Sequence, residues 1–452
     1  MAATCLALIL AAGEGTRMRS ALPKVMHAVG GRPMLGHAID AARAAGVDRL
    51  AVVIGPGAES VANFVAGAAS EASVHVQAER RGTAHAALAA RPALEAGADE
   101  VLVLYGDTPL VTPATLLAVR ERLAAGADLV VLGFEAADPT GYGRLVIENG
   151  RPTAIVEERD ADAATRAIRL VNSGILGFRG ALLPRLIDRI GNANAKGEFY
   201  LTDAVALAAG EGLDLAVVRG AETEFLGVND RAQLARAESE FQARARAAAL
   251  GGGATLVAPE TVFFAYDTRL GRDVIVEPNV VFGPGVSVAD GTTIRAFSHL
   301  EGARVAAGAI VGPFARLRPG AEIAAGAHIG NFVEIKNAAV GAGAKVNHLS
   351  YVGDADVGAA VNIGAGTVTC NYDGFTKHRT EIGAGAFVGS NTTLVAPIGV
   401  GEGAFVAAGS VVTEPVPADA LALGRARQVV KEGRATALRA RFKAAKAARP
   451  ER

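Results

Sequence analysis

The chain has 452 residues, a length typical of two or three domains, and 50% of them are hydrophobic, which is enough for packed cores. Its 45 Lys and Arg residues nearly balance its 46 Asp and Glu residues, so binding of nucleic acid over a broad basic surface is not indicated. The two cysteines, Cys5 and Cys370, lie far apart in the sequence, which argues against a disulfide framework and fits a reducing cytoplasm.

The first expected element is an apolar run from Thr4 to Leu10, which is typical of a central parallel strand. No Lys or Arg precedes the run and a Gly-rich loop follows it, so we interpret it as a buried strand rather than a signal peptide. No stretch reaches about 18 uninterrupted apolar residues, so no membrane span is predicted.

Helices and strands then alternate along the first half of the chain. We expect helix 35–45, strand 50–54, helix 60–69, strand 74–77, helix 83–90, strand 101–104 and helix 115–124. This alternation predicts a Rossmann-like α/β domain with a doubly wound, mostly parallel sheet. Ligands of such sheets bind beyond the carboxyl ends of the strands.

Two features follow strand ends in this domain. The Gly-rich loop Gly13–Arg17 suits a phosphate group, because glycines let backbone N–H groups approach an anion and Arg17 and Lys24 add positive charge. It lacks the spacing of a dinucleotide fingerprint or a P-loop, and a tight strand-to-helix turn is the alternative. Asp107 follows the strand that ends near Leu104, where a carboxylate is suited to Mg²⁺; a helix cap or turn residue is the alternative.

Residues 230–250 predict a long helix rich in Ala, Arg, Glu and Gln, which Gly251–Gly253 would end. We interpret this helix as a connection between domains, and a partner-binding helix is the alternative. From Leu270 to Val412 an apolar residue then recurs at every sixth position, with shorter steps after Leu300, Ile335 and Val352. Hexapeptide repeats of this kind predict a parallel β-helix, whereas the turns of a β-sandwich come every ~8–12 residues.

The repeat carries polar residues and one interruption, and both indicate more than a scaffold. Between Thr369 and Ile382 the period breaks, so this segment must leave the coil as a loop. Polar side chains gather just before it: Arg316, Arg318, Glu334, Lys336, Asn347, His348, Tyr351 and Asn362. Steps of 18 residues separate Arg318, Lys336 and Asp354, which places two cations one coil apart on one face. His348 is a candidate general base; a structural or merely exposed histidine is the alternative.

Residues 10–18, Leu-Ala-Ala-Gly-Glu-Gly-Thr-Arg-Met, followed by Pro23-Lys24, resemble the signature loop of the sugar-nucleotide pyrophosphorylases. With a hexapeptide-repeat half behind it, the whole chain resembles the GlmU family of bifunctional enzymes. These enzymes acetylate glucosamine-1-phosphate and then uridylylate the product. Further matches are Gly82-Thr83, Tyr105-Gly106-Asp107, residues 141–143, 197–203 and 227–229, and in the repeat half residues 331–334, 347–348, 364–366 and 370–374.

The resemblance implies a fold with a left-handed parallel β-helix in the second half, and two sets of site residues. The uridyltransferase residues it implies are Leu10, Ala11, Ala12, Gly13, Arg17, Lys24, Gln77, Gly82, Thr83, Tyr105, Gly106, Asp107, Gly141, Glu157, Asn172 and Asn229. Among them, Gln77 would read the uracil base, and Asp107 and Asn229 would bind Mg²⁺. The substrates would be UTP and N-acetylglucosamine-1-phosphate.

For acetyl transfer the resemblance implies His348 as the catalytic base. The residues implied for glucosamine-1-phosphate are Arg318, Lys336, Tyr351, Asn362, Asn371, Tyr372 and Lys377, and those for acetyl-CoA are Ala365, Ser390, Ala408 and Arg425. Glu334 would orient His348. Family members are homotrimers that supply UDP-N-acetylglucosamine for peptidoglycan and lipopolysaccharide synthesis. We expect no nucleic-acid partner. The segment Arg425–Arg452 holds ten Lys and Arg residues against Glu432 and Glu451, and a basic tail of this kind can bind nucleic acid. Phosphate binding near coenzyme A, or solvation of the tail, is the preferred interpretation.

The domains expected are a uridyltransferase domain at 1–229, a linker helix at 230–250 and an acetyltransferase domain at 251–452. Two other functions remain open from sequence. One is a pyrophosphorylase whose repeat half only oligomerises or binds regulators. The other is a non-catalytic assembly subunit with both folds. A scaffold would not require His348, Lys336, Arg318 and the loop at Asn371 together.

Overall fold

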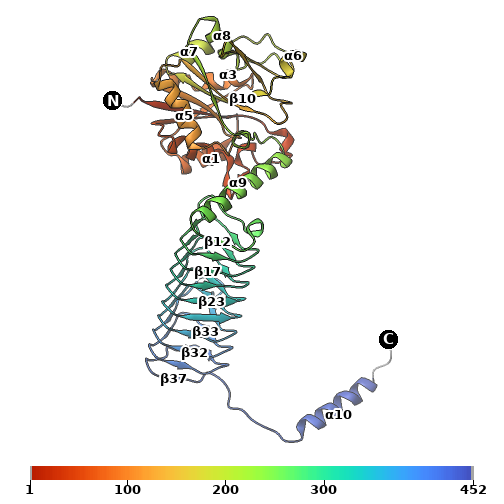
Figure 1. Cartoon of the computed structure of the whole chain (residues 1–452). Helices are drawn as coiled ribbons and strands as arrows, with labels where there is room; N and C mark the ends of the chain where they lie inside the picture. The colour runs from red at the N-terminus through yellow and green to blue at the C-terminus, as the bar shows by residue number, and fades with distance from the viewer. Residues whose placement is uncertain (1–2, 449–452) are drawn as a thin grey trace. The chain divides into compact units, whose positions relative to one another are not determined.

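The computed structural model describes residues 3–448, which fall into two compact units (Figure 1). The first holds the chain up to Gly251 together with Phe263–Thr268, and the second holds Gly252–Val262 and the chain from Arg269 onward. Residues 449–452 of the expected basic tail lie outside the described part. Within residues 3–448, no helix has both the length and the apolar character needed to cross a membrane.

The first unit is built on a nine-stranded sheet around β1 (Cys5–Ala11), all of whose residues are buried. The main order is β11-β7-β10-β6-β1-β4-β5. The other strands are β4 (Arg49–Ile54), β5 (Ser73–Val76), β6 (Glu100–Tyr105), β7 (Leu129–Glu135), β8 (Arg144–Glu148), β9 (Arg151–Val156), β10 (Leu170–Arg179) and β11 (Leu215–Arg219). All pairs in the main order are parallel except those of β10. A separate hairpin joins β2 (Ala28–Val29) and β3 (Arg32–Pro33).

Helices cover both faces of this sheet because alternate residues of β1 point to opposite sides. Ala7 and Ile9 belong to a core with α1, α2 and α5, whereas Leu6 and Leu8 belong to a core with α3, α7 and α8. The helices are α1 (Met34–Ala44), α2 (Glu59–Ala68), α3 (Thr83–Ala89), α4 (Arg91–Glu95), α5 (Pro113–Ala124), α6 (Ala163–Arg166), α7 (Leu182–Ile187) and α8 (Asp203–Gly210). The doubly wound fold is therefore confirmed, and every helix and strand expected between residues 4 and 124 is present.

Helix α9 (Arg231–Gly251) occupies the expected connection and packs on the first unit. Ala237 is buried, the Gly30 N–H donates to Glu238 at 2.7 Å, and Arg244 donates to the Leu110 carbonyl oxygen at 2.7 Å. These contacts make α9 part of the first unit rather than a free spacer.

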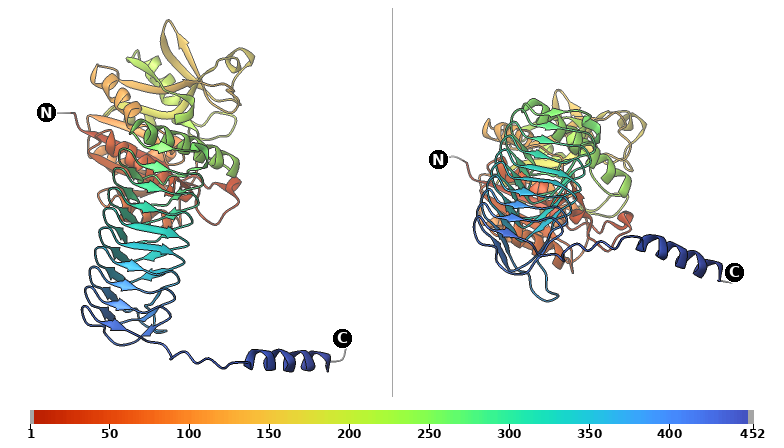
Figure 2. Two further views of the ribbon diagram at one scale, coloured as in Figure 1. Left: turned by 60° about the horizontal axis from the view of Figure 1, so that its bottom comes forward. Right: turned by 90° about the horizontal axis from the view of Figure 1, so that it is seen from below.

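The second unit is a left-handed parallel β-helix of three sheets (Figure 2). Sheet I has ten strands: β12 (Thr255–Leu256), β14 (Ile275–Val276), β17 (Thr293–Ile294), β20 (Ile310–Val311), β23 (His328–Asn331), β26 (Lys345–His348), β29 (Asn362–Ile363), β32 (Phe387–Val388), β35 (Phe405–Val406) and β37 (Leu421–Ala422). Sheet II has eight: β13 (Arg269–Leu270), β16 (Ser287–Val288), β19 (Ala303–Val305), β22 (Ala321–Ile323), β25 (Ala338–Val340), β28 (Ala355–Val357), β31 (Thr380–Ile382) and β34 (Ile398–Val400). Sheet III also has eight: β15 (Val281–Phe282), β18 (His299–Leu300), β21 (Arg316–Leu317), β24 (Glu334–Lys336), β27 (Tyr351–Gly353), β30 (Val368–Cys370), β33 (Thr393–Val395) and β36 (Val411–Val412).

The apolar residues of the repeat are the ones that point inward. Val276, Ile294, Val311 and Ile335 are fully buried, as expected for one inward residue on each side of a coil. The short steps of the sequence repeat all fall at the corner from sheet III to sheet II, and the loop between β30 and β31 leaves the coil at the same corner. The coil also extends beyond Val412, the last position of the expected repeat, because β37 pairs with β35 and adds one more strand.

The basic tail forms a helix that the sequence did not predict, α10 (Arg434–Ala447). None of its residues is buried.

Candidate active sites

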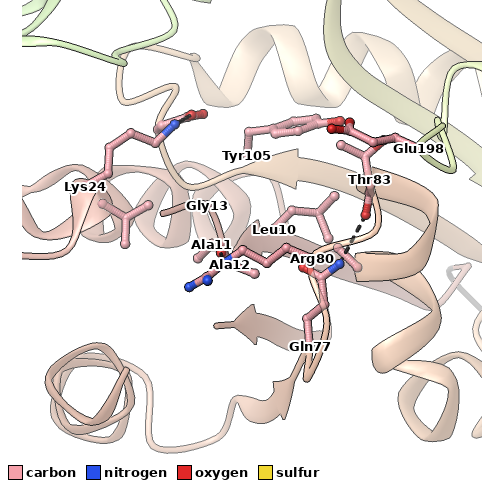
Figure 3. A pocket seen from close by; sticks show the side chains of 14 residues that line it. Leu10, Ala11, Ala12, Gly13, Lys24, Gln77, Arg80, Thr83, Tyr105 and Glu198 are labelled. Carbon is pink, nitrogen blue, oxygen red and sulfur yellow. Dashed lines mark hydrogen bonds and ion pairs between the residues drawn. The ribbon is translucent and has the colours of Figure 1, made fainter. Parts of the chain in front are cut away.

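The first unit contains two adjoining cavities at the carboxyl ends of β1 and β6, with volumes of about 260 and 490 Å³. Thr83, Tyr105 and Asp107 line both cavities. The smaller is also lined by Leu10, Ala11, Ala12, Gly13, Lys24, Gln77 and Gly82 (Figure 3), and the larger by Arg17, Gly141, Glu157, Asn172 and Asn229. The structure thus brings together every residue predicted for uridylyl transfer except Gly106, which lines neither cavity.

Gly106 instead allows close packing behind the cavities. A Cβ there would lie 3.2–3.3 Å from side-chain atoms of Val25, Ala11 and Leu35. Gly106 therefore helps to position the end of β6, which Asp107 follows.

The segment after β5 is tied to the Gly-rich loop by Arg80, a residue that the sequence motifs did not single out. Arg80 donates from Nε to the Ala12 carbonyl oxygen at 2.9 Å and pairs with Glu14 at 2.8 Å. Gln77 is buried and donates to the Gly82 carbonyl oxygen at 3.2 Å (Figure 3). Arg80 and Glu198 both line the smaller cavity, and the adjacency of Arg80 to Gln77 and Gly82 was the only signal in the sequence.

Asp107 and Asn229 converge on one cation. The Lys24 ammonium pairs with the Asp107 carboxylate and donates to Asn229 Oδ1 at 3.0 Å. The two oxygen-bearing segments are held together because the Val228 N–H donates to the Asp107 carbonyl oxygen at 2.9 Å. Carboxylate and amide oxygens are hard ligands of the kind that Mg²⁺ takes, and a positive charge already lies between them. The residues therefore fit a divalent cation.

Glu157 gives the larger cavity a carboxyl group that is a weaker acid than usual. Burial raises the pKa of Glu157 above its ordinary value, although Thr202 donates a hydrogen bond to it at 3.3 Å. The Glu157 carboxyl group can hydrogen-bond a sugar hydroxyl in this cavity. Because few waters reach its ionised form, a hydroxyl donor would replace the missing solvation.

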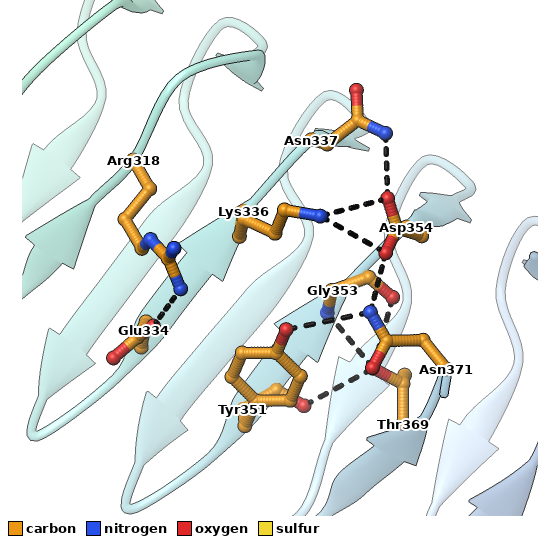
Figure 4. Close-up of polar contacts among 9 residues, drawn as sticks. All are labelled: Arg318, Glu334, Lys336, Asn337, Tyr351, Gly353, Asp354, Thr369 and Asn371. Carbon is orange, nitrogen blue, oxygen red and sulfur yellow. Dashed lines mark hydrogen bonds and ion pairs between the residues drawn. The ribbon is translucent and has the colours of Figure 1, made fainter. Parts of the chain in front are cut away.

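In the second unit, polar side chains on sheet III form one network centred on Asp354 (Figure 4). Lys336 Nζ lies 3.2 Å from both carboxylate oxygens of Asp354, and Asn371 donates to the same carboxylate. Asn371 also donates to the Tyr351 hydroxyl at 3.4 Å. One coil earlier, Arg318 pairs with Glu334 at 2.9 Å. The predicted stacking of Arg318 and Lys336 on one face is confirmed by the register of β21 and β24.

His348 lies at the corner from sheet I to sheet III and is oriented by a neighbour one coil away. Its Nδ1 lies 2.8 Å from Asn331 Oδ1, so the amide oxygen accepts the Nδ1 proton and Nε2 remains free to accept another. The expectation that Glu334 orients His348 is wrong, because the Glu334 carboxylate pairs with Arg318 and Arg316 instead. The sequence motif at residues 331–334 contained the correct partner as its first residue.

The residues predicted for acetyl-CoA stack at this same corner. The registers of β26, β29, β32 and β35 align His348 with Ala365, Ser390 and Ala408 on successive coils. The residue that directly follows each member of this column has a left-handed backbone. On the earlier coils it is the exposed Phe332 (φ 56°) and Leu349 (φ 50°), and after Ala365 it is Gly366 (φ 76°). The large apolar side chains of the earlier coils thus give way to Gly366, Asn391 and Gly409 on the coils where acetyl-CoA is expected. Arg425 follows β37 at the end of this column.

The remaining predicted residues are divided between the loop and another sheet. Tyr372 and Lys377 form an antiparallel bridge within the loop between β30 and β31. The neighbouring Lys336 holds the pKa of Lys377 below its ordinary value. Asn362 lies on sheet I, away from the Asp354 network on sheet III. One chain therefore presents the residues predicted for acetyl transfer on more than one face.

Comparisons with known proteins agree with both halves. Residues 7–170 match the model of the MobA-like NTP transferase domain. The bifunctional protein GlmU of Xanthobacter autotrophicus is 62% identical over 96% of this chain and 97% of its own length. The proteins of the same name from Azorhizobium caulinodans and Agrobacterium fabrum are 60% and 54% identical over 96% and 99% of this chain.

The chain belongs to the GlmU family.

As a member of the GlmU family it is a bifunctional enzyme of UDP-N-acetylglucosamine synthesis, with glucosamine-1-phosphate N-acetyltransferase and N-acetylglucosamine-1-phosphate uridyltransferase activities. Its substrates are small molecules, and enzymes of the GlmU family work with a divalent metal and acetyl-CoA. Membership in the GlmU family rules out the two alternatives in which the repeat half is only a scaffold.

Proposed function

We propose that each activity has its own site: uridylyl transfer at the two cavities of the first unit, and acetyl transfer at the His348 corner and Asp354 network of the second. The observation that carries the proposal is the hydrogen bond from His348 to Asn331, which sets a free imidazole nitrogen beside the open corner at Ala365. The domains proposed are residues 1–229 and 251–452, joined through the helix at 230–250.

For uridylyl transfer, the Gly-rich loop and Gly82–Thr83 bind the nucleotide, with Gln77 reading uracil. Arg17 and Lys24 neutralise the triphosphate, and Glu157, Asn172 and Gly141 hold the N-acetylglucosamine moiety. A phosphate oxygen of N-acetylglucosamine-1-phosphate attacks the α-phosphorus of UTP, and the bond to the leaving pyrophosphate breaks. Asp107 and Asn229 would hold Mg²⁺, which supplies charge neutralisation at the phosphates.

For acetyl transfer, Arg318, Lys336 and Lys377 bind the phosphate of glucosamine-1-phosphate, and Tyr351 and Asn362 complete its site. Asn371 orients the amine, and His348 Nε2 accepts its proton as the amine attacks the thioester carbonyl of acetyl-CoA. The backbone N–H of Tyr372 stabilises the oxyanion, and the coenzyme A thiolate leaves. Ala365, Ser390, Ala408 and Arg425 contact the coenzyme. Transfer is direct, so Cys370 forms no acyl-enzyme.

We further infer a cytoplasmic homotrimer. Assembly is supported by an exposed apolar column on the sheet I to sheet III corner, where Phe297, Phe314 and Phe332 stack with ring centroids 4.9 and 5.1 Å apart. It is also supported by the division of the acetyltransferase residues between two sheets. A reducing compartment is supported by two free cysteines, Cys5 and Cys370.

The test is a pair of assays on the purified full-length protein. Coenzyme A release should require glucosamine-1-phosphate and acetyl-CoA, and pyrophosphate release should require UTP, N-acetylglucosamine-1-phosphate and Mg²⁺. Cys370→Ser should retain coenzyme A release. Loss of turnover in Cys370→Ser with normal binding of both substrates would contradict direct transfer.

A further inference from the structure

Asp354 is a buried carboxylate that the site residues of either activity do not include. Only 7% of its surface is exposed, and its backbone has the left-handed conformation, with φ 48°. It lies at the corner where β27 ends, and its side chain meets Lys336 and Asn337 on the preceding coil and Asn371 on the following one (Figure 4). A buried carboxylate is costly unless paired, so its partners define its role.

Three donors surround Asp354. Lys336 contributes its ammonium at 3.2 Å, Asn337 its amide nitrogen at 2.6 Å, and Asn371 its amide nitrogen. Burial alone would raise the pKa of Asp354, but the hydrogen bonds from Asn337, Asn371 and Lys336 outweigh it and lower that pKa. An ionised carboxylate only accepts hydrogen bonds, so every neighbour must present a donor to it.

This requirement fixes the orientation of the Asn371 side-chain amide. Its nitrogen must face the Asp354 carboxylate and the Tyr351 hydroxyl. Its Oδ1 is then turned away from Asp354, and within residues 3–448 no hydrogen bond of another residue involves that oxygen. An amide oxygen accepts the N–H of a primary amine and leaves the amine lone pair for attack, whereas an amide nitrogen in its place would oppose the amine hydrogens.

We infer that Asp354 is a positioning residue for acetyl transfer, which holds Asn371 with its amide oxygen toward the amine of glucosamine-1-phosphate. The inference rests on the proposed role of Asn371. Lys336 is held by the same carboxylate, so the phosphate-binding cation and the amine-orienting amide share one anchor. The Tyr351 hydroxyl accepts a hydrogen bond from the same Asn371 amide nitrogen, so it favours the same orientation of the amide as Asp354 does.

The test compares Asp354→Asn, Asn371→Ala and their double variant in the full-length enzyme. A misplaced reacting group can cost about 100-fold in rate, so Asp354→Asn should lower kcat of acetyl transfer by about 100-fold. KM for glucosamine-1-phosphate should change less than about threefold, because Lys336 keeps its charge and Arg318 is held by Glu334 rather than by Asp354. The double variant should be no slower than Asn371→Ala, because both changes remove one function.

Asp356→Asn is the matched control. Asp356 lies two residues further along, has a half-exposed side chain, and pairs with Arg379 rather than with the network. The kcat of acetyl transfer in Asp356→Asn should therefore stay at the wild-type value. Uridyltransferase activity of every variant reports whether the protein remains intact. Should Asp354→Asn fail to fold, Asn337→Gly removes one donor to the same carboxylate, suits the positive φ of 46° at a position that neither proposed site includes, and should lower kcat by several-fold.

Three outcomes overturn the inference: wild-type kcat in Asp354→Asn, multiplicative losses in the double variant, or an effect confined to KM. Wild-type kcat in Asn371→Ala would instead overturn the proposed role of Asn371 itself, which separates failure of the proposed function from failure of the inference.

Discussion

The Lys24 ammonium occupies the place that a divalent cation would take between Asp107 and Asn229, so the two should compete. The Lys24 and Asp107 side chains are only 11% and 19% exposed, and the cation must break both of the ammonium's hydrogen bonds to enter. A hydrogen bond to a charged group contributes about 1.5–3 kcal/mol. Lys24→Met should therefore raise the affinity for the cation without nucleotide by about 10- to 100-fold.

The assay is titration with Mn²⁺ alone, followed by electron paramagnetic resonance of the free ion, on nucleotide-free protein. Arg17→Met is the matched control: Arg17 lines the same cavity as Asp107 and Asn229, but no hydrogen bond joins it to either in residues 3–448. Arg17→Met should change the affinity for Mn²⁺ much less than Lys24→Met does. With UTP present the advantage of Lys24→Met should shrink, because phosphates also draw Lys24 away. Equal Mn²⁺ affinity of Lys24→Met and wild type would refute the competition.

Three further predictions follow from the structure. Asn331→Ala removes the acceptor of the His348 Nδ1 proton, and it should lower kcat of acetyl transfer by about 10- to 100-fold while pyrophosphate release stays normal. The folded protein holds the proton of Glu157 more tightly than the unfolded chain, so ionising it costs stability as pH rises above its ordinary 4.5. Glu157→Gln should accordingly unfold at higher denaturant than wild type at pH 8, with the difference vanishing below pH 4.5; a constant difference would contradict this. Phe314→Asp should weaken the trimer in sedimentation, and an unchanged trimer would argue against the aromatic column as its contact.

The sequence was most informative where local patterns determine structure. The apolar run at β1 and the six-residue period predict a doubly wound sheet and a β-helix, because side-chain periodicity follows directly from backbone geometry. Motif residues such as Asp107 and Asn229 lie far apart in the sequence of the first domain, and resemblance, not spacing, predicted that they meet.

What the sequence did not predict depends on side-chain contacts between coils. Glu334 was expected to orient His348, yet Asn331 does so, because the registers of β23 and β26 place Asn331 one coil above His348. Asp354 stood out in the sequence only for its spacing from Lys336. Its three donors converge because a five-residue step tightens the corner after β27, and a repeat period alone does not specify which side chains meet at such a corner.

The central claim is that one chain carries two independent active sites. It is tested most directly by measuring coenzyme A release and pyrophosphate release in parallel for His348→Ala and Asp107→Ala. The account predicts that His348→Ala loses only the first activity and that Asp107→Ala loses only the second. Loss of both activities from either substitution, in protein that remains folded, would contradict it.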